Sequence, residues 1–285
     1  MKVDFDFGKD IRIVRATLQM SQVDFADALD VTNVTLSLWE NGKAIPSRNQ
    51  IEALYRFAEE HGLPINTMKA RFFEDDAKGE KLLFHGARRE IAFPIDLIHG
   101  NPKSDFGAAF YLGETLQQAG SWVSELPEGS VYCFYFDHQN LNILRFGVER
   151  DWALAVCYYR GYLEGKEKQP LIQTLVQKIE QADVVVAPIA DNLMYDTLRQ
   201  FSSGFMTDEQ CFHALSANQL GLQYILRSEG SLSSITPIGR LYLAELERAR
   251  YAKIKQAESM NGFAKLRISL SEYQNKGLYI DGILS

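Results

Sequence analysis

Short helical segments separated by turn residues occupy residues 7–63, and this feature constrains the fold more than any other in the chain. Ser21 and Thr32 are good N-caps for the second and third segments, and Pro46 stands where the next one starts. Asp30 stands in the tight turn between the second and third segments. Its short side chain suits this place, because Asp tolerates left-handed backbone geometry better than most residues. The apolar residues recur at helical spacing and predict the inward faces: Ile11, Val14, Leu18, Phe25, Ala26, Leu29, Ile51, Leu54, Phe57 and Ala58.

Residues 14–47 read VRATLQMSQVDFADALDVTNVTLSLWENGKAIPS. This segment resembles the Cro/repressor family of helix-turn-helix domains. The resemblance implies that Arg15 and Glu40 pair and tie the first helix to the third, and that double-stranded DNA is the partner. It also implies which residues approach the phosphates or face the major groove: Gln22, Thr32, Asn33, Val34, Thr35, Leu38, Asn41 and Lys43.

The charge of this region leaves an alternative open. Residues 1–66 hold seven Lys and Arg against ten Asp and Glu, and the whole chain has a formal net charge of −7. The predicted groove face offers Asn33 and Thr35 but no Arg, so few base contacts are expected. Weak affinity for DNA or a requirement for a homodimer would follow, and the alternative is a helical module that docks a partner protein.

Beyond residue 80 the sequence changes, and β-type runs are interleaved with helical segments. Strands are expected at 82–85, 110–112, 131–136 and 184–187, with helices at 116–126 and 170–181. Because regular βαβ spacing is lacking, this pattern favours an α+β domain over a Rossmann sheet. From Pro237 onward the sequence predicts one charged amphipathic helix, which either covers this domain or contacts a second copy. The expected parts are a helix-turn-helix domain at 1–66, a connector at 67–80, the α+β domain at 81–235 and a C-terminal helical extension at 236–285.

Composition narrows the remaining options. Hydrophobic residues make up 46% of the chain, which is enough for a packed core. Cys133, Cys157 and Cys211 are far apart and form no CxxC pair, so buried reduced thiols are expected rather than disulfides or a metal site. No apolar run reaches the roughly 20 residues of a membrane helix, and residues 1–10 lack a signal-peptide pattern. We therefore expect a cytoplasmic protein without membrane contact.

Several sequence blocks of the second domain occur together. They are LLFHGARREIAFP at 82–94, SDFGAAFYLGETLQQAGSWV at 104–123, NILRF at 142–146, DW at 151–152, DVVVAPIAD at 183–191 and LQYIL at 222–226. In this order they resemble a bacterial family of largely uncharacterised proteins grouped with the ADP-ribosyltransferases. The resemblance covers about residues 82–231. It implies an α+β domain with a split pair of small sheets and NAD as substrate or ligand. From the spacing of the cysteines, no metal is expected.

The resemblance also assigns roles to four residues. Transfer of ADP-ribose from NAD breaks the bond between nicotinamide and ribose through a transition state that resembles an oxocarbenium ion. By the resemblance, His85 is the donor that holds the ribose hydroxyls, and Tyr111 stacks on nicotinamide. The backbone of Gly86 can approach the nicotinamide amide closely because no side chain intervenes. Gln223 stands where transferases commonly have a Glu that binds the ribose.

Gln223 departs from the transferase pattern, since an amide brings no negative charge. The carboxylate could come from Asp105, Asp191 or Glu229, or the domain could bind NAD without turning it over. Asp105 has a structural interpretation as well, in which it accepts hydrogen bonds from the amides of its own turn at 105–107. Taken singly, His85 would be a hydrogen-bonded core histidine and Tyr111 a packing aromatic.

Together these observations predict an autoregulatory DNA-binding regulator fused to an ADP-ribosyltransferase-like toxin or effector, an arrangement similar to toxin–antitoxin modules. In this hypothesis His85, Tyr111 and Gln223 are catalytic, and ADP-ribose passes to a macromolecular acceptor. The alternative is a transcription factor whose transferase-like domain senses a nucleotide without chemistry.

Overall fold

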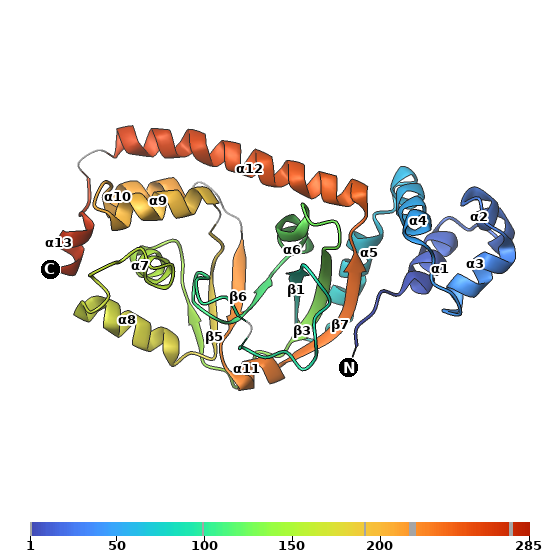
Figure 1. Cartoon of the computed structure of the whole chain (residues 1–285), viewed down its shortest axis with the longest axis horizontal. Coiled ribbons are helices and arrows are strands. Elements are labelled where there is room, and N and C mark those ends of the chain that lie inside the picture. Colours follow the sequence, from blue (N-terminus) through green and yellow to red (C-terminus); the bar gives the residue numbers. More distant parts are fainter. Residues whose placement is uncertain (1, 99, 191, 217–220, 274–275) are drawn as a thin grey trace.

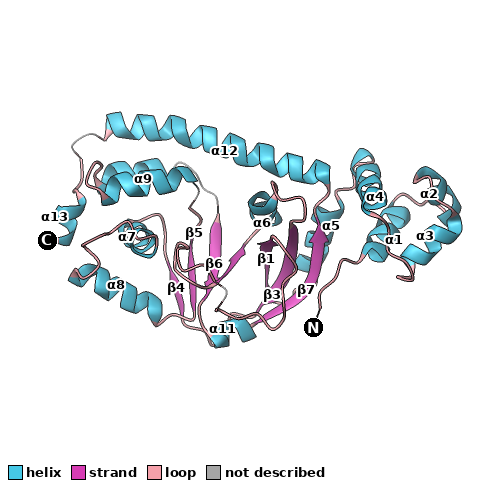
Figure 2. Ribbon diagram, in the orientation of Figure 1, coloured by secondary structure: helices cyan, strands magenta, loops and turns pink. Residues whose placement is uncertain are grey.

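The computed structural model describes residues 2–98, 100–190, 192–216, 221–273 and 276–285. A helical region formed by the N-terminal residues lies at one end of the elongated molecule, and a mixed α/β domain makes up the rest (Figure 1). A long C-terminal helix begins beside the helical region and runs along one side of the α/β domain (Figure 2).

The N-terminal region contains the predicted short helices. They are α1 (Phe7–Thr17), α2 (Gln22–Ala28), α3 (Asn33–Glu40) and α4 (Arg48–Glu60), followed by α5 (Ile65–Asp75). The Ser21 hydroxyl accepts from the Asp24 amide and the Thr32 hydroxyl from the Thr35 amide, so both predicted N-caps are confirmed. Asp30 has a φ of 54°, the left-handed geometry expected for the turn.

The strands of the second domain form one sheet. They are β1 (Lys81–Ala87), β2 (Phe110–Gly113), β3 (Ser130–Phe136), β4 (Ile143–Arg145), β5 (Val184–Pro188), β6 (Leu222–Leu226) and β7 (Ile235–Tyr242). Their order is β4-β5-β6-β2-β1-β3-β7, and only the β4–β5 pair is parallel within the described strands. The strands predicted at 82–85, 110–112, 131–136 and 184–187 are all confirmed.

The joint between β1 and β2 is the narrowest in this sheet. Its register consists of the pair Phe84↔Gly113, whereas β1 pairs with β3 along its whole length. We expected a split pair of small sheets, and the structure instead has seven strands linked across this short joint. The strands therefore diverge beside β1, which leaves room for a cavity there.

Helices cover both sides of the sheet. They are α6 (Leu116–Val123), α7 (Arg150–Tyr159), α8 (Pro170–Glu180), α9 (Asn192–Ser202), α10 (Asp208–Leu215), α11 (Glu229–Ser233), α12 (Glu245–Glu272) and α13 (Ile280–Leu284). The helices predicted near 116–126 and 170–181 correspond to α6 and α8. Trp152 and Cys157 of α7 are fully buried in the largest core cluster, which also takes in β5, β6, α8, α9 and α10.

The prediction for the C-terminal part is wrong in its first residues. We expected a helix from Pro237, but β7 extends to Tyr242 and α12 begins at Glu245. The physical reason is that β3 is almost entirely buried and needs a partner on its outer side, which β7 provides with Val131 opposite Leu241. The domain boundary expected at 235/236 would therefore separate a strand from its sheet.

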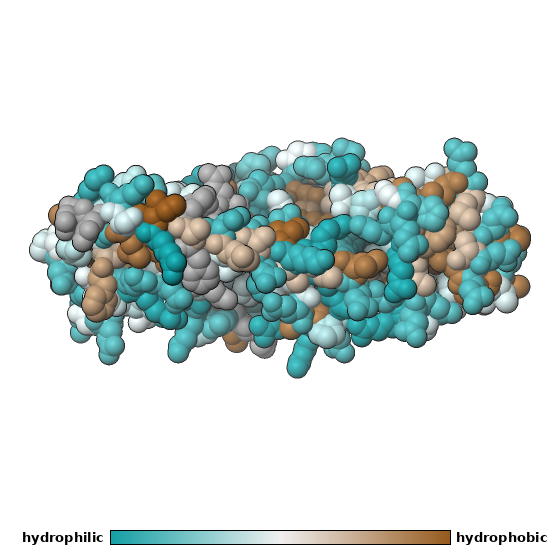
Figure 3. Space-filling model, turned by 90° about the horizontal axis from the view of Figure 1, so that it is seen from above, coloured by the Kyte–Doolittle hydropathy of each residue, from teal (hydrophilic) through white to brown (hydrophobic). Residues whose placement is uncertain are grey.

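Helix α12 covers the α/β domain, one of the two roles expected for it. It contacts α6, α9 and α10, and Figure 3 shows this face of the molecule to be mostly hydrophilic, with apolar side chains in small groups. None of the helices that the structure describes is both long and apolar enough to cross a membrane. A dimer contact through α12 stays a prediction.

The helical region is joined to the sheet domain by buried polar contacts. The Lys69 ammonium of α5 pairs with the Asp10 carboxylate of α1 at 2.6 Å, and Asn66 donates to the backbone oxygen of Tyr242 at 2.7 Å. Asn66 also donates to the Glu247 carboxylate of α12 at 2.6 Å. The segment expected as a connector at 67–80 is therefore mostly a helix that packs on both regions.

Candidate functional site

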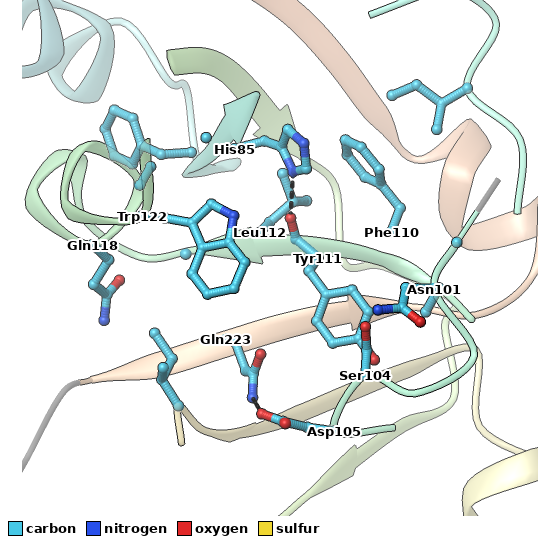
Figure 4. Close-up of a pocket in the computed structure, with 18 of the residues that line it drawn as sticks. His85, Asn101, Ser104, Asp105, Phe110, Tyr111, Leu112, Gln118, Trp122 and Gln223 are labelled. Atoms are coloured by element: carbon cyan, nitrogen blue, oxygen red, sulfur yellow. Dashed lines mark hydrogen bonds between the residues drawn. The ribbon is translucent and has the colours of Figure 1, made fainter. Parts of the chain in front are cut away.

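A cavity of about 600 Å³ opens beside β1 and β2, under α6 and the loop that precedes β2 (Figure 4). Its volume is in the range of pockets that bind small molecules and cofactors. All four predicted NAD-site residues line it, although they are far apart in the sequence: His85, Gly86, Tyr111 and Gln223. The tertiary structure thus brings these residues together.

Gly86 allows α6 to lie directly against β1. A Cβ at this position would stand 2.5 Å from the backbone oxygen of Ala119 in α6, which is closer than any side chain tolerates. Ala119 and Trp122 of the same helix line the cavity, and the Trp122 side chain remains exposed at its rim. The glycine therefore sets how closely this wall of the cavity approaches the strand.

His85 is half-buried and held in one tautomer. Its Nδ1 lies 2.7 Å from the backbone oxygen of Tyr111, and because a carbonyl oxygen only accepts, Nδ1 carries the proton. Burial lowers the pKa of His85, so the imidazole is neutral near pH 7 and Nε2 keeps a free lone pair. We expected a donor to the ribose hydroxyls, but this tautomer makes Nε2 an acceptor.

Tyr111 fixes the turn that precedes its own strand. Its hydroxyl accepts from the amide of Phe106 at 3.1 Å and donates to the backbone oxygen of Gly107 at 2.8 Å. Burial raises the pKa of Tyr111, which keeps the phenol protonated and able to donate. The hydroxyl is thus occupied by the protein, and the ring is the part of this side chain available to a ligand.

Gln223 belongs to a buried polar network that the sequence did not predict. Its amide nitrogen donates to the Asp105 carboxylate at 3.0 Å and to the backbone oxygen of Pro188 at 3.1 Å. Asp105 also receives Arg160 in an ion pair of 2.7 Å and the hydroxyl of Tyr195 at 2.9 Å. The expected bonds from the turn amides at 105–107 to Asp105 are not among those of the described residues, so this side chain serves the cavity wall and not its own turn.

The other two candidate carboxylates do not join this network in the structure. Glu229 is exposed at the start of α11, away from the residues that line the cavity. Asp191 lies outside the described residues. Of the three acids considered, Asp105 is the one placed at the site.

Sequence reasoning missed Arg160, Tyr195 and Trp122 as cavity residues. Arg160 follows the last turn of α7 and its guanidinium stacks on the Tyr195 ring, 3.9 Å from the ring centre. No spacing in the sequence links these residues to Asp105, which lies 55 positions before Arg160. Trp122 could have been found from the sequence, because it lies on the same short amphipathic helix as Gln118, where a large aromatic side chain is unusual. The structure shows this side chain to be exposed.

The helix-turn-helix region has the internal tie that its sequence implied. Arg15 Nε pairs with Glu40 Oε1 at 2.7 Å and links α1 to α3, as predicted. Gln22 donates to the same carboxylate at 2.8 Å, and Asn41 donates to the backbone oxygen of Ser37. These two predicted phosphate contacts are thus preoriented by bonds within the protein.

The predicted groove face of α3 is largely exposed. Val34 is 70% and Leu38 39% exposed, although both are apolar. Asn33 and Lys43 are exposed as well, while Thr35 is half-buried beside the Thr32 hydroxyl. Exposed apolar side chains on a helix of this kind fit contacts with thymine methyl groups in a major groove.

The structure also settles the surroundings of the thiols. Cys133, Cys157 and Cys211 are free and buried, as predicted. Burial raises the pKa of Cys133 and Cys157 to about 12, so neither is a nucleophile at neutral pH. In the described part of the chain, no three His, Cys, Asp or Glu side chains gather closely enough to hold a metal ion.

Family models match two segments of this chain. Residues 82–236 match a family described as protein of unknown function (DUF3990), and this segment is more than half of the chain. Residues 11–57 match a helix-turn-helix family, which supports a DNA-binding regulator. No curated protein and no solved structure matches the chain.

Proposed function

We propose that this chain, which belongs to the DUF3990 family, is an autoregulatory DNA-binding regulator. Its helix-turn-helix would bind DNA, and its second domain would be an NAD-binding, ADP-ribosyltransferase-like domain. One observation carries the second half of this proposal. His85, Gly86, Tyr111 and Gln223, which the resemblance singled out, line one cavity of about 600 Å³.

The geometry suits the nicotinamide riboside half of NAD. A ribose hydroxyl can donate to Nε2 of His85, and the Tyr111 ring offers an apolar face to the nicotinamide. Gly86 lines the same cavity, so its backbone is available to the carboxamide, while the backbone of α6 fills the place that a Cβ would take. Gln223 offers an amide oxygen to the other ribose hydroxyl.

The proposed reaction breaks the bond between the ribose C1′ and the nicotinamide nitrogen. The electron pair of that bond stays with nicotinamide, which leaves neutral. A nucleophile of a macromolecular acceptor then forms a bond to C1′, and its proton passes to the solvent. Such a modification of a cellular component would make the domain a toxin or effector, with the helix-turn-helix limiting its synthesis.

Release of nicotinamide tests this function. The purified chain is incubated with NAD, and nicotinamide is quantified by chromatography for the wild type, His85→Ala and Glu229→Ala. Glu229 is the matched control, because it is an exposed residue outside the cavity. Release by wild type and E229A but not by H85A supports the transferase. Equal release from all three proteins rejects the assignment of the site.

A nucleotide sensor without chemistry is the second candidate, and the charge balance of the site favours it. Gln223 carries no charge, and the negative charge of Asp105 is paired with Arg160 at 2.7 Å. A change in promoter affinity on addition of NAD, without release of nicotinamide, would select this function.

The DNA-binding half is tested separately. DNase footprinting on the region upstream of its own gene should show protection by the wild type and not by an Asn33→Ala, Val34→Ala double variant. Sedimentation in the presence of that DNA would show whether the proposed homodimer forms. Absence of protection by the wild type would favour the docking of a partner protein.

A further inference from the structure

We propose that Asp105 is a positioning residue that holds the Gln223 amide with its carbonyl oxygen facing the cavity. The inference rests on the proposed function only in assigning Gln223 to the ribose. It concerns how an amide can stand at a position where transferases commonly have a carboxylate.

The partners of Gln223 leave one orientation of its amide. Nε2 lies 3.0 Å from Asp105 Oδ2 and 3.1 Å from the backbone oxygen of Pro188, and both of these oxygens act as acceptors. A flipped amide would set its own oxygen against two acceptors and lose both hydrogen bonds. Both amide protons are therefore used by the protein.

Asp105 acts through Gln223 and not directly on a ligand. Its Oδ1 receives Nε and Nη2 of Arg160 at 3.0 and 2.7 Å and the hydroxyl of Tyr195 at 2.9 Å. The residue is 4% exposed, so a ligand has little access to it. Arg160 and Tyr195 hold the carboxylate in place through Oδ1. Its other oxygen, Oδ2, orients the Gln223 amide.

The free end of the amide is its oxygen. Figure 4 shows the Gln223 carbonyl pointing away from Asp105 into the cavity. No donor among the described residues bonds to this oxygen, which leaves it open to a ligand. A ribose hydroxyl is a fitting partner, because it can donate to an acceptor that has no proton of its own.

The carboxylate also strengthens this acceptor. An amide whose protons are given to a negative group is polarised, and its oxygen gains negative character through a cooperative chain of hydrogen bonds. That partial charge would face the ribose, where positive charge develops when nicotinamide leaves. Asp105 and Gln223 together would thus present a partly negative acceptor to the ribose, a role that a single Glu has in transferases.

This arrangement makes an unusual prediction for Gln223→Glu. The change introduces the residue common in transferases, but it sets two carboxylates about 3 Å apart at a buried place, where like charges disfavour ionisation. We expect Q223E to bind NAD about tenfold to a hundredfold more weakly than the wild type. Adding Asp105→Asn to Q223E exchanges amide and carboxylate and restores a donor facing an acceptor at the contact between residues 105 and 223. Because an ionised carboxylate at 223 has no proton for the backbone oxygen of Pro188, the double variant should recover part of the affinity.

The experiment compares wild type, D105N, Q223E and the D105N/Q223E double variant. Calorimetry gives the Kd for NAD, chromatography gives nicotinamide release, and thermal unfolding between pH 5 and 9 gives a readout that needs no NAD. In Q223E one carboxyl of the pair has a pKa raised above its unfolded value of about 4, so its Tm should fall as pH rises. The wild type and the double variant should not show this step.

The outcomes separate the two proposals. A wild type that neither binds NAD nor releases nicotinamide overturns the proposed function, while the pH dependence of Tm in Q223E still decides the positioning role. NAD binding and Tm of Q223E equal to the wild type at every pH would overturn the positioning role alone. A double variant no better than Q223E in Tm and NAD affinity would also overturn it.

Discussion

A buried ion pair between Lys69 and Asp10 joins α5 to α1 of the helical region. The two atoms are 2.6 Å apart, and the side chains are 6% and 2% exposed. The Tyr55 hydroxyl donates to the other Asp10 oxygen at 2.8 Å, and burial keeps the pKa of Tyr55 well above its usual value. Lys69→Met keeps the volume of the side chain but leaves the carboxylate buried, with Tyr55 as its remaining side-chain partner among the described residues.

The size of the effect follows from this geometry. Two unit charges at the observed 2.6 Å attract by roughly 6 kcal/mol when the effective dielectric constant is about 20. Part of this attraction offsets the cost of taking both charges out of water. Removal of one partner of such a pair costs about 3–5 kcal/mol, because the other charge stays uncompensated. We expect K69M to lose that much free energy of unfolding.

Urea unfolding followed by circular dichroism measures this loss. Lys168→Met is the matched control, because Lys168 is exposed and has no ion pair among the described residues. Asp10→Asn combined with K69M should regain most of the loss, since no charge is then buried. A K69M protein within about 1 kcal/mol of the wild type would refute the reasoning, because so large a penalty cannot be hidden by relaxation.

Three further predictions concern the helix-turn-helix and the cavity. Arg15→Met leaves the Glu40 carboxylate with Gln22 as its side-chain partner, so the region should lose about 1–3 kcal/mol and bind DNA more weakly in a mobility-shift assay. Gly86→Ala places a methyl group 2.5 Å from a backbone oxygen of α6 and should cost about 1–3 kcal/mol in thermal unfolding, while Gly147→Ala, with open space around it, should be neutral. Burial lowers the pKa of His85 below its unfolded value, so its contribution to stability is complete above about pH 6.5 and is lost as pH falls; His85→Gln should flatten this part of the curve of Tm against pH.

The helix-turn-helix shows how far local sequence patterns reach. Its caps at Ser21 and Thr32, the left-handed turn at Asp30 and the pair of Arg15 and Glu40 were all predicted, because each depends on neighbours within a few turns of helix or on a well-defined motif. The strands of the second domain were found for the same reason, since their apolar runs have a length and composition typical of buried strands. The sequence by itself therefore determined the elements and the residues with chemical potential.

Tertiary structure decided how these elements meet. Residues 237–242 have a helical appearance, yet they form β7 because the buried strand β3 needs a partner at its outer side. Asp105 seemed to belong to its own turn, but packing places it beside Gln223, 118 positions away. Hydrogen-bond partners at such separations depend on the register of strands and the approach of helices, and neither leaves a periodic trace in the sequence. The cavity and its network were decided by the folded chain, because only folding sets the distances between groups that the sequence keeps far apart.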